Sequence, residues 1–291
     1  TGGSNVALGT SALSANTTQS GNTAIGYQSL QTNTTASQLV AVGYQAGKTV
    51  SAGGGSGTFI GYQAGTLTTG SSNTALGALA LASNTTASNN TAVGYQSLTT
   101  NTTGQYNTAV GYNSLSVNNA NYNTAVGHDA LDVNTTGQQQ VAVGQNALGA
   151  NTTGSYNVAV GRNTLVVNTT GAENVAIGTY ALDSNTTGTG NVAIGYGAGN
   201  TITTGTKNTI IGGYDGNQGG LDIRTTSNNI VLSDGDGNPK VWIDANSILR
   251  LPADAANENA SSGEGVTMSG SAGYIISTRT SGSANVYLNK A

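Results

Sequence analysis

The chain has 291 residues, of which 7% are charged and 5% aromatic, with 44 glycines and a net charge of −4. The eight lysines and arginines are spread singly, which argues against an electrostatic nucleic-acid binder. There is no cysteine, so disulfides and thiolate metal sites are excluded. No apolar run approaches the roughly 18 residues that span a bilayer.

One five-residue phrase, exemplified by Asn107 to Gly111, recurs with small edits from the first residues to about Gly212. Its last glycine, here called the anchor glycine, returns every 17 residues, with one spacing of 18 and two of 16. A short period kept over thirteen copies is typical of a solenoid. We therefore expect an all-β chain: a parallel β-solenoid (β-roll) of about thirteen 17-residue coils. The anchor glycines are Gly9, Gly26, Gly43, Gly61, Gly77, Gly94, Gly111, Gly127, Gly144, Gly161, Gly178, Gly195 and Gly212.

Two neighbouring apolar columns precede the anchor glycine. The residue directly before it is aliphatic in all thirteen copies, and the one before that is Ala in eleven. Neighbours in a strand point to opposite faces, so both faces are apolar. Our first assignment buries the Val/Ile column and leaves the Ala column outside for self-association. The opposite assignment remains open. The predicted core residues are Val93, Val110, Val126, Val143 and Val160, and the predicted self-association residues are Ala92, Ala109, Ala125, Ala142 and Ala159.

A corner follows the strand. Four residues after the anchor, nine copies carry Leu, and seven after it the same nine carry Asn. We expect the Leu side chains, including Leu98, Leu115 and Leu131, to fill the core and the Asn side chains to form a ladder between coils. Eight of these corners read Asn-Thr-Thr, which also fits an N-glycosylation acceptor. A polar turn is the favoured interpretation.

Tyrosine occupies the position directly after the anchor in six copies, where successive rings are expected to stack. Such a stripe is a candidate receptor-binding surface, because it can offer flat amphipathic faces to a sugar. Packing at a turn or at a subunit boundary is the competing and favoured interpretation. The single histidine, His128, takes the same position, without a second ligand nearby in sequence. The six candidates are Tyr27, Tyr44, Tyr62, Tyr95, Tyr112 and Tyr196.

After about Gly213 the period dissolves, and three regions are predicted: a repeat shaft over 1–220, a β-hairpin segment over 221–251, and a linker with the start of a C-terminal β region over 252–291. The hairpin joins strands at 229–233 and 240–244. Further strands are expected at 247–251, 274–277 and 285–288, with a loop over 252–266. The turn at 234–239 resembles a calcium loop only in its first residues. We expect that this sequence is a piece of a longer protein.

No motif predicts catalysis, a metal or a cofactor. The stretch 43–49 has three residues between its glycines where a phosphate-binding loop needs four. The four acids of the repeats, Asp129, Asp132, Glu173 and Asp183, do not pair as a sugar-cleaving site needs. We therefore predict a non-enzymatic protein.

The phrase Asn191-Val192-Ala193-Ile194-Gly195 resembles the repeat of the YadA-like head domain of trimeric autotransporter adhesins, although the period of those heads is shorter. Residues 228–239 and 273–290 resemble segments common in bacteriophage tail-fibre proteins. Together these resemblances imply a homotrimer and a role in attachment.

The leading hypothesis is a trimeric phage tail-fibre shaft that presents a host-receptor-binding surface. It would be located in the virion, with other tail proteins and a host cell-surface glycan or protein as partners, and with neither nucleic acid nor membrane insertion. A trimeric adhesin at the bacterial surface is the alternative. An ice-binding solenoid and a polysaccharide-degrading tail spike are further alternatives.

Overall fold

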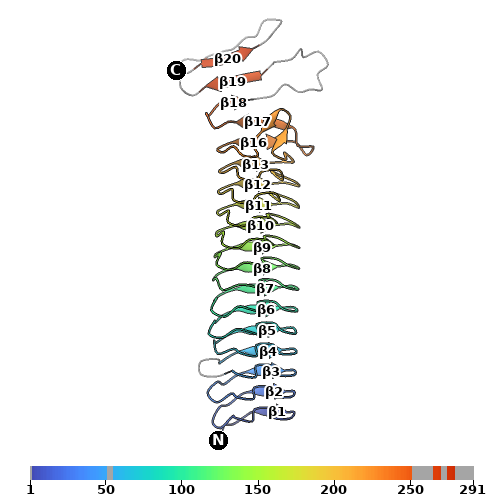
Figure 1. Ribbon diagram of the computed structural model, residues 1–291, viewed down its shortest axis with the longest axis vertical. Coiled ribbons are helices and arrows are strands. Elements are labelled where there is room, and N and C mark those ends of the chain that lie inside the picture. Colours follow the sequence, from blue (N-terminus) through green and yellow to red (C-terminus); the bar gives the residue numbers. More distant parts are fainter. Residues whose placement is uncertain (1, 51–54, 251–264, 270–273, 279–291) are drawn as a thin grey trace.

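The computed structural model describes residues 2–50, 55–250, 265–269 and 274–278, and every described element is a β-strand. The chain winds into a long rod of stacked coils (Figure 1). Thirteen three-residue strands run along it, each paired in parallel with the strand of the next coil. The predicted parallel β-solenoid with 17-residue coils is therefore confirmed.

The thirteen strands coincide with the repeated phrase. Each comprises the three residues directly before an anchor glycine. They are β1 Val6–Leu8, β2 Thr23–Ile25, β3 Val40–Val42, β4 Thr58–Ile60, β5 Thr74–Leu76, β6 Thr91–Val93, β7 Thr108–Val110, β8 Thr124–Val126, β9 Val141–Val143, β10 Val158–Val160, β11 Val175–Ile177, β12 Val192–Ile194 and β13 Thr209–Ile211.

The anchor glycines form a column, and two separate reasons exclude a side chain at these positions. Gly111 has φ +139°, a conformation that L side chains rarely adopt. A Cβ built on it would lie 2.3 Å from the carbonyl oxygen of Gly127 in the next coil. The strand therefore ends at the glycine, and the chain turns there in every coil.

The Ala column faces the interior and the Val/Ile column faces outward, so our first assignment of the two apolar columns is wrong. The five predicted self-association alanines, Ala92, Ala109, Ala125, Ala142 and Ala159, are fully buried inside the coil. The five predicted core valines point outward: Val126 is 36% exposed, and Val93, Val110, Val143 and Val160 are partly exposed. The physical reason is space, because a 17-residue coil leaves room for little more than a methyl group opposite the corner leucine.

Two coils show this limit directly. Phe59 replaces Ala in the inward column, and Gly65 then replaces the corner leucine of the same coil. A Cβ on Gly65 would lie 2.1 Å from the Phe59 ring. Ile210 likewise stands in a coil that has Gly216 at the corner, above a coil with Gly199 there. Among β1 to β13, a larger inward residue thus occurs only where the corner of its own coil and the corner of the coil before it are both Gly.

The corner leucines are buried as predicted, in an unusual backbone conformation. Leu98, Leu115 and Leu131 are fully buried, with φ between +49° and +52°. A left-handed conformation costs an L residue about 1–2 kcal/mol, whereas burying a leucine side chain gains about 1.5–3 kcal/mol. The burial term is the larger of the two, which explains why the corner keeps Leu. Gly47, Gly65 and Gly199 adopt similar angles at this position without that cost.

Two columns of buried asparagines run through the interior. The predicted corner ladder is present: Asn151 Nδ2 donates to Asn134 Oδ1 at 2.9 Å, and Asn168 Nδ2 donates to Asn151 Oδ1 at 2.9 Å. A second column, at the first position of the repeated phrase, was not predicted. There the Asn107 amide N–H donates to Asn90 Oδ1 of the coil below at 2.9 Å. Both columns pair most of their buried polar groups between coils, whereas the Oδ1 atoms of Asn84 and Asn185 in the corner ladder have no partner.

The C-terminal elements are mostly as predicted. The strands β16 and β17 form the expected antiparallel hairpin, and β18 pairs with β17 within the predicted 247–251. The expected strand at 274–277 appears as β20, whereas β19 begins inside the predicted loop 252–266. The expected strand at 285–288 lies outside the described residues. The elements are β14 Asn217–Gln218, β15 Leu221–Asp222, β16 Ile230–Ser233, β17 Pro239–Ile243, β18 Leu249–Arg250, β19 Gly265–Ser269 and β20 Tyr274–Thr278.

The predicted division at residue 220 is no break in the sheet. Strand β16 pairs in parallel with β13, so that Ile210 lies opposite Val231. Val231 is fully buried and continues the inward column, and the Asn229 amide N–H donates to Asn208 Oδ1 at 3.0 Å. The hairpin segment therefore begins as one more coil of the solenoid. The insertion that carries β14 and β15 lengthens this coil and obscures its period in the sequence.

Candidate binding surfaces

The outward face of the long sheet carries two columns of side chains. Since the middle residue of each strand points inward, the first and third point outward, as the exposed or partly exposed pairs of β1 to β13 show. Every one of these outward residues is Val, Ile, Leu or Thr, and none is charged. Leu76, Ile177, Ile194 and Ile211 are each between 39% and 46% exposed. The chain thus displays an uncharged, mainly β-branched strip that its own residues do not cover.

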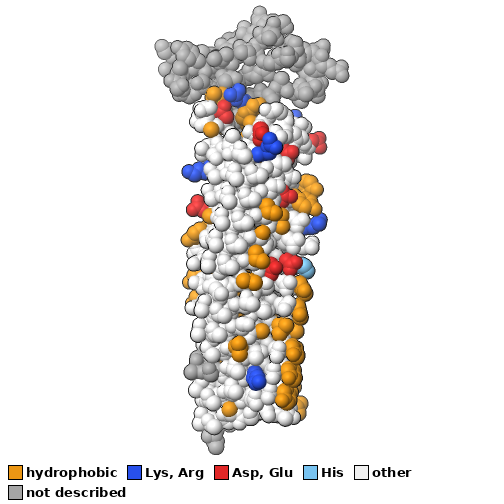
Figure 2. All heavy atoms as spheres, in the orientation of Figure 1, with side chains coloured by type: hydrophobic (Ala, Val, Ile, Leu, Met, Phe, Trp, Pro, Cys, Tyr) orange, Lys and Arg blue, Asp and Glu red, His pale blue; other side chains and the backbone are white. Residues whose placement is uncertain are grey.

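The predicted tyrosine stacks are present in two groups. Tyr27, Tyr44 and Tyr62 form one, with ring centroids 5.2 and 5.3 Å apart, and Tyr95 lies 5.4 Å from Tyr112 in the other. His128 extends the second group, with its ring 4.9 Å from Tyr112. Hydrophobic side chains form a stripe along one edge of the lower half of the rod (Figure 2).

These stacks do not offer ring faces along their whole length. Interplanar angles of 9° to 17° mean that each ring inside a stack covers the faces of its neighbours. Ring edges and hydroxyl groups are what the solvent meets there. Only the terminal rings of a stack retain an outer face. Tyr196 belongs to neither group; it is 73% exposed and packs edge-on against Tyr180 at 5.9 Å.

A second tyrosine column was missed in the sequence. Tyr106 and Tyr122 stack at 5.1 Å with an interplanar angle of 5°, and Tyr156 lies in the same column two coils further on. All three are more than half exposed. Their shared position, five residues before the anchor glycine, is the signal that could have revealed them.

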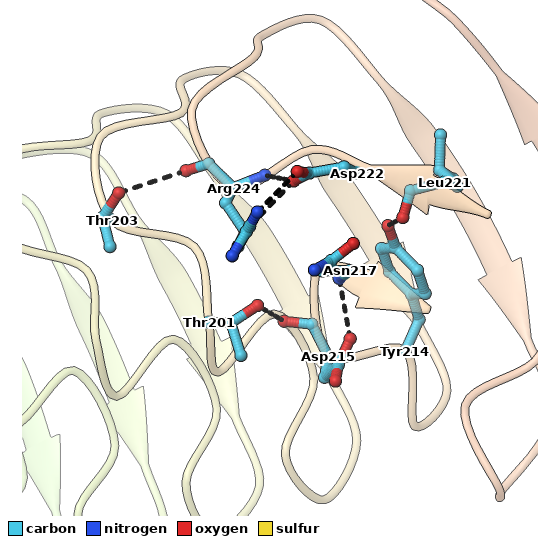
Figure 3. Close-up of polar contacts among 8 residues, drawn as sticks. All are labelled: Thr201, Thr203, Tyr214, Asp215, Asn217, Leu221, Asp222 and Arg224. Carbon is cyan, nitrogen blue, oxygen red and sulfur yellow. Dashed lines mark hydrogen bonds and ion pairs between the residues drawn. The ribbon is translucent and has the colours of Figure 1, made fainter. Parts of the chain in front are cut away.

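The insertion between β13 and β16 forms a cluster of polar contacts with the preceding coil, shown in Figure 3. The buried Tyr214 donates its hydroxyl hydrogen to the Leu221 carbonyl oxygen at 2.8 Å. Burial raises the pKa of this phenol far above its usual value, and the carboxylates of Asp215 and Asp222 add to the rise. Thr201 donates to the Asp215 carbonyl oxygen at 2.9 Å. The phenol is therefore neutral, and its hydroxyl group serves to tie the insertion together.

Charged groups in and after this insertion pair with near neighbours. The Arg224 guanidinium donates to Asp222 at 2.7 Å, and this bond lowers the pKa of the carboxyl group. In the loop with partial calcium-site likeness, Asp234 Oδ1 accepts the amide N–H groups of Asp236 at 3.1 Å and Asn238 at 2.8 Å. Lys240 Nζ lies 3.3 Å from Asp234 Oδ2. The Asp234 carboxylate thus closes its own turn.

Within the described ranges, no group of three or more His, Cys, Asp or Glu side chains is placed to hold a metal ion. His128 Nδ1 lies 2.9 Å from the carboxylate of its sequence neighbour Asp129. The described part of the chain also contains no helix with the length and apolarity to cross a membrane.

The Asn-Thr-Thr corners are poor glycan acceptors in the folded chain. Asn134, Asn151 and Asn168 are fully buried. The Nδ2 atom of each donates both to the asparagine of the coil below and to a glycine carbonyl oxygen. This nitrogen is the atom a glycan would modify, so the geometry favours the polar-turn interpretation.

The combination of fold and surface defines a parallel β-solenoid with one uncovered apolar sheet face and two exposed tyrosine columns. No family model, curated protein or solved structure matches this chain. The candidate function therefore depends on the surfaces themselves and on the resemblances in the repeat.

Proposed function

We propose that the protein is a structural segment of a homotrimeric attachment fibre, in which identical chains associate side by side through the outward sheet face. The observation that carries this proposal is the uncharged strip formed by the first and third residues of β1 to β13. A contiguous apolar strip of this kind on a soluble chain marks an association surface. The predicted self-association is thus kept, but it moves from the Ala column to the Val/Ile column.

The strip favours a second copy of the same chain as its partner. Its residues repeat with each coil, about every 4.8 Å along the rod, and a parallel copy has the same repeat. Chains in register therefore meet coil by coil, and no charged side chain of the strip has to be buried in the contact. Closed rotational symmetry buries the strip on every chain. The number three is the one implied by the resemblance to trimeric adhesin heads.

A fibre of this kind acts by holding and presenting a surface rather than by catalysis. The resemblance of residues 228–239 to tail-fibre segments supports a location in a bacteriophage tail, with a host cell-surface glycan or protein as the receptor. A trimeric adhesin on a bacterial surface is the alternative and uses the same assembly.

Sedimentation equilibrium of the purified chain tests the assembly, together with electron microscopy of the particles. The expected result is three times the 28.7 kDa chain mass and unbranched rods. A sample that sediments with the mass of one chain at micromolar concentration would refute the proposal.

One observation favours a second candidate function, ice binding. In β4 to β8 the outward pair is Thr followed two residues later by Val, Ile or Leu, repeated over five successive coils. A regular sheet of threonine and aliphatic side chains is a surface that ordered water can match. This role needs the same face to be free, so a monomer with thermal hysteresis would favour it. A trimer without thermal hysteresis would exclude it.

A further inference from the structure

The tyrosine column after the anchor glycines has one gap that lies between two rings. In the coil of β5 this position is Ala78, with Tyr62 in the coil before and Tyr95 in the coil after. Tyr62 ends the first stack and Tyr95 begins the second. Each of these two rings therefore has one face that no other ring covers. We call this place the Ala78 gap.

The gap has the size of one six-membered ring. Ring centroids within the stacks are 5.2 to 5.4 Å apart, and the two terminal rings are two coils apart, or about 10 Å at the usual spacing of strands. A ring bound midway lies about 5 Å from each tyrosine, the distance at which aromatic groups stack. Tyr62 is 51% exposed and Tyr95 is 44% exposed, so both rings are accessible to solvent.

A column of hydrogen-bonded glutamine side chains is interrupted in the same coil. Gln45 Nε2 donates to Gln28 Oε1 at 2.7 Å, and Gln63 Nε2 donates to Gln45 Oε1 at 2.9 Å. The next residue of this column is Leu79, which cannot continue it, and Gln96 follows. In the described part of the chain Gln96 makes no side-chain hydrogen bond. Carboxamides with spare bonding capacity thus adjoin the gap in the coils on both sides of it.

We propose that the Ala78 gap binds one hexopyranose ring of a neutral glycan. The two C–H faces of the sugar stack on Tyr62 and Tyr95, and its equatorial hydroxyl groups bond to the carboxamides of Gln63 and Gln96. This inference rests on the attachment role proposed above and names the class of receptor. It also replaces the predicted six-tyrosine receptor stripe with a single site at two of those residues.

The chemistry around the gap favours a sugar over a purely aromatic ligand. A phenyl ring fits between the two tyrosines but leaves the neighbouring amides without partners. A pyranose has apolar faces and a rim of hydroxyl groups, so it satisfies both the rings and the amides. No side chain in the gap is charged, which favours a neutral sugar over an acidic one.

Filling the gap is the sharpest test. Ala78→Tyr places in this coil the residue that six other coils carry at the same position, so the fold is expected to persist. The matched control is Gln145→Tyr, which adds a tyrosine to the same column between His128 and Arg162, where no gap exists. Binding of methyl β-glucopyranoside, methyl β-galactopyranoside and methyl N-acetyl-β-glucosaminide to the full chain is measured by saturation-transfer NMR, with phenol as the aromatic probe.

The expected result is binding of at least one glycoside to the wild-type chain and to Gln145→Tyr, with a loss of about tenfold or more in Ala78→Tyr. Tyr62→Ala and Tyr95→Ala should show a comparable loss. Binding of phenol alone, binding of no probe, or equal glycoside binding by Ala78→Tyr would overturn the proposal. Sedimentation of the same samples distinguishes failure of the glycan site from failure of the fibre proposal. A trimer that binds no glycoside overturns only the glycan site.

Discussion

Two neighbouring blocks of coils, here called the lower half (β4 to β8) and the upper half (β9 to β12), share one interior but differ on their outward sheet face. From β4 to β8 the first outward residue is Thr in every strand, whereas from β9 to β12 it is Val. The inward residue is Ala in all of these strands except β4, which has Phe59. The interior therefore specifies the coil, and the outward face varies independently of it. In the proposed fibre, the half with Val at the first outward position and Val or Ile at the second associates more strongly than the half with Thr at the first.

The largest effect is expected from a charge on the outward face. Val110→Asp in β7 and Val160→Asp in β10 each bring one unpaired carboxylate per chain into the proposed interface, at a cost of at least about 3 kcal/mol. Both variants should lose the trimer in light scattering while their circular dichroism remains that of a folded solenoid. Thr103→Asp, on an exposed corner, is the control and should remain trimeric. Trimers of unchanged stability in Val110→Asp would show that this face is not the interface.

Over-packing of the interior should act equally in both halves. Ala109→Phe in β7 and Ala176→Phe in β11 insert a ring opposite a corner leucine, which costs about 1–3 kcal/mol. Thermal unfolding should show similar decreases in melting temperature for the two variants. Replacing Leu98 and Leu115 by Gly beside Ala109→Phe should recover part of the loss, because two of the three glycines that accommodate the Phe59 ring, Gly47 and Gly65, occupy these corner positions. Full stability of either single variant would contradict the inward placement of alanine.

Exchanging the outward residues between halves should shift association in opposite directions. A triple variant with Thr91→Val, Thr108→Val and Thr124→Val removes three hydroxyl groups from the interface. Burying each without a partner costs about 1–3 kcal/mol. The trimer should then dissociate at higher guanidinium concentration. The reverse triple variant, with Val141→Thr, Val158→Thr and Val175→Thr, should dissociate at lower concentration. Shifts of the same sign in both would remove the distinction between the halves.

The smallest effect concerns a single carboxyl group in the upper half. Burial raises the pKa of the Asp183 carboxyl group above its usual value, so folding favours the protonated form. Its unfavourable contribution is absent below the unfolded-state pKa and complete once the pH exceeds the raised folded-state value. Asp183→Asn should therefore increase the melting temperature slightly at pH 7 and leave it unchanged at pH 3.

The equivalent residue three coils below is a matched control for this change. The Asp132 carboxylate accepts a hydrogen bond from the Ser116 hydroxyl. Asp132→Asn weakens this charge-assisted bond and should not stabilise the chain at pH 7. A pH-independent increase in Asp183→Asn would mean that the charge of this carboxyl group is not the cause.

The coil itself could be predicted from the sequence, because its period, its anchor glycines and its paired Leu and Asn corners all depend on local patterns. Which apolar column faces inward could not be decided from strand alternation, since Ala and Val are both common in cores. The deciding signal was nevertheless present. Phe59 and Ile210, the two exceptions in the Ala column, both occur in coils with Gly at the corner.

The binding surfaces were only partly predictable. Stacking of the tyrosines follows from the repeat, but the covering of their faces depends on the ring spacing, which no sequence pattern supplies. The Ala78 gap became meaningful only when the stacks on both sides were seen to end there. The column of buried asparagines before the strands was visible in the repeated phrase, yet its hydrogen bonds run between coils and required the structure.

Disulfide cross-linking tests the assignment of the outward face most directly, because the chain has no cysteine of its own. Val110→Cys and Ala109→Cys place a thiol on neighbouring residues that point to opposite faces of β7. In an in-register parallel trimer, Cys at position 110 meets its counterparts from the other chains, whereas at position 109 it is enclosed within one coil. Mild oxidation should therefore cross-link the Val110→Cys chains into dimers on a denaturing gel and leave the Ala109→Cys chains single. Cross-linking of Ala109→Cys, or none in Val110→Cys, would contradict the account.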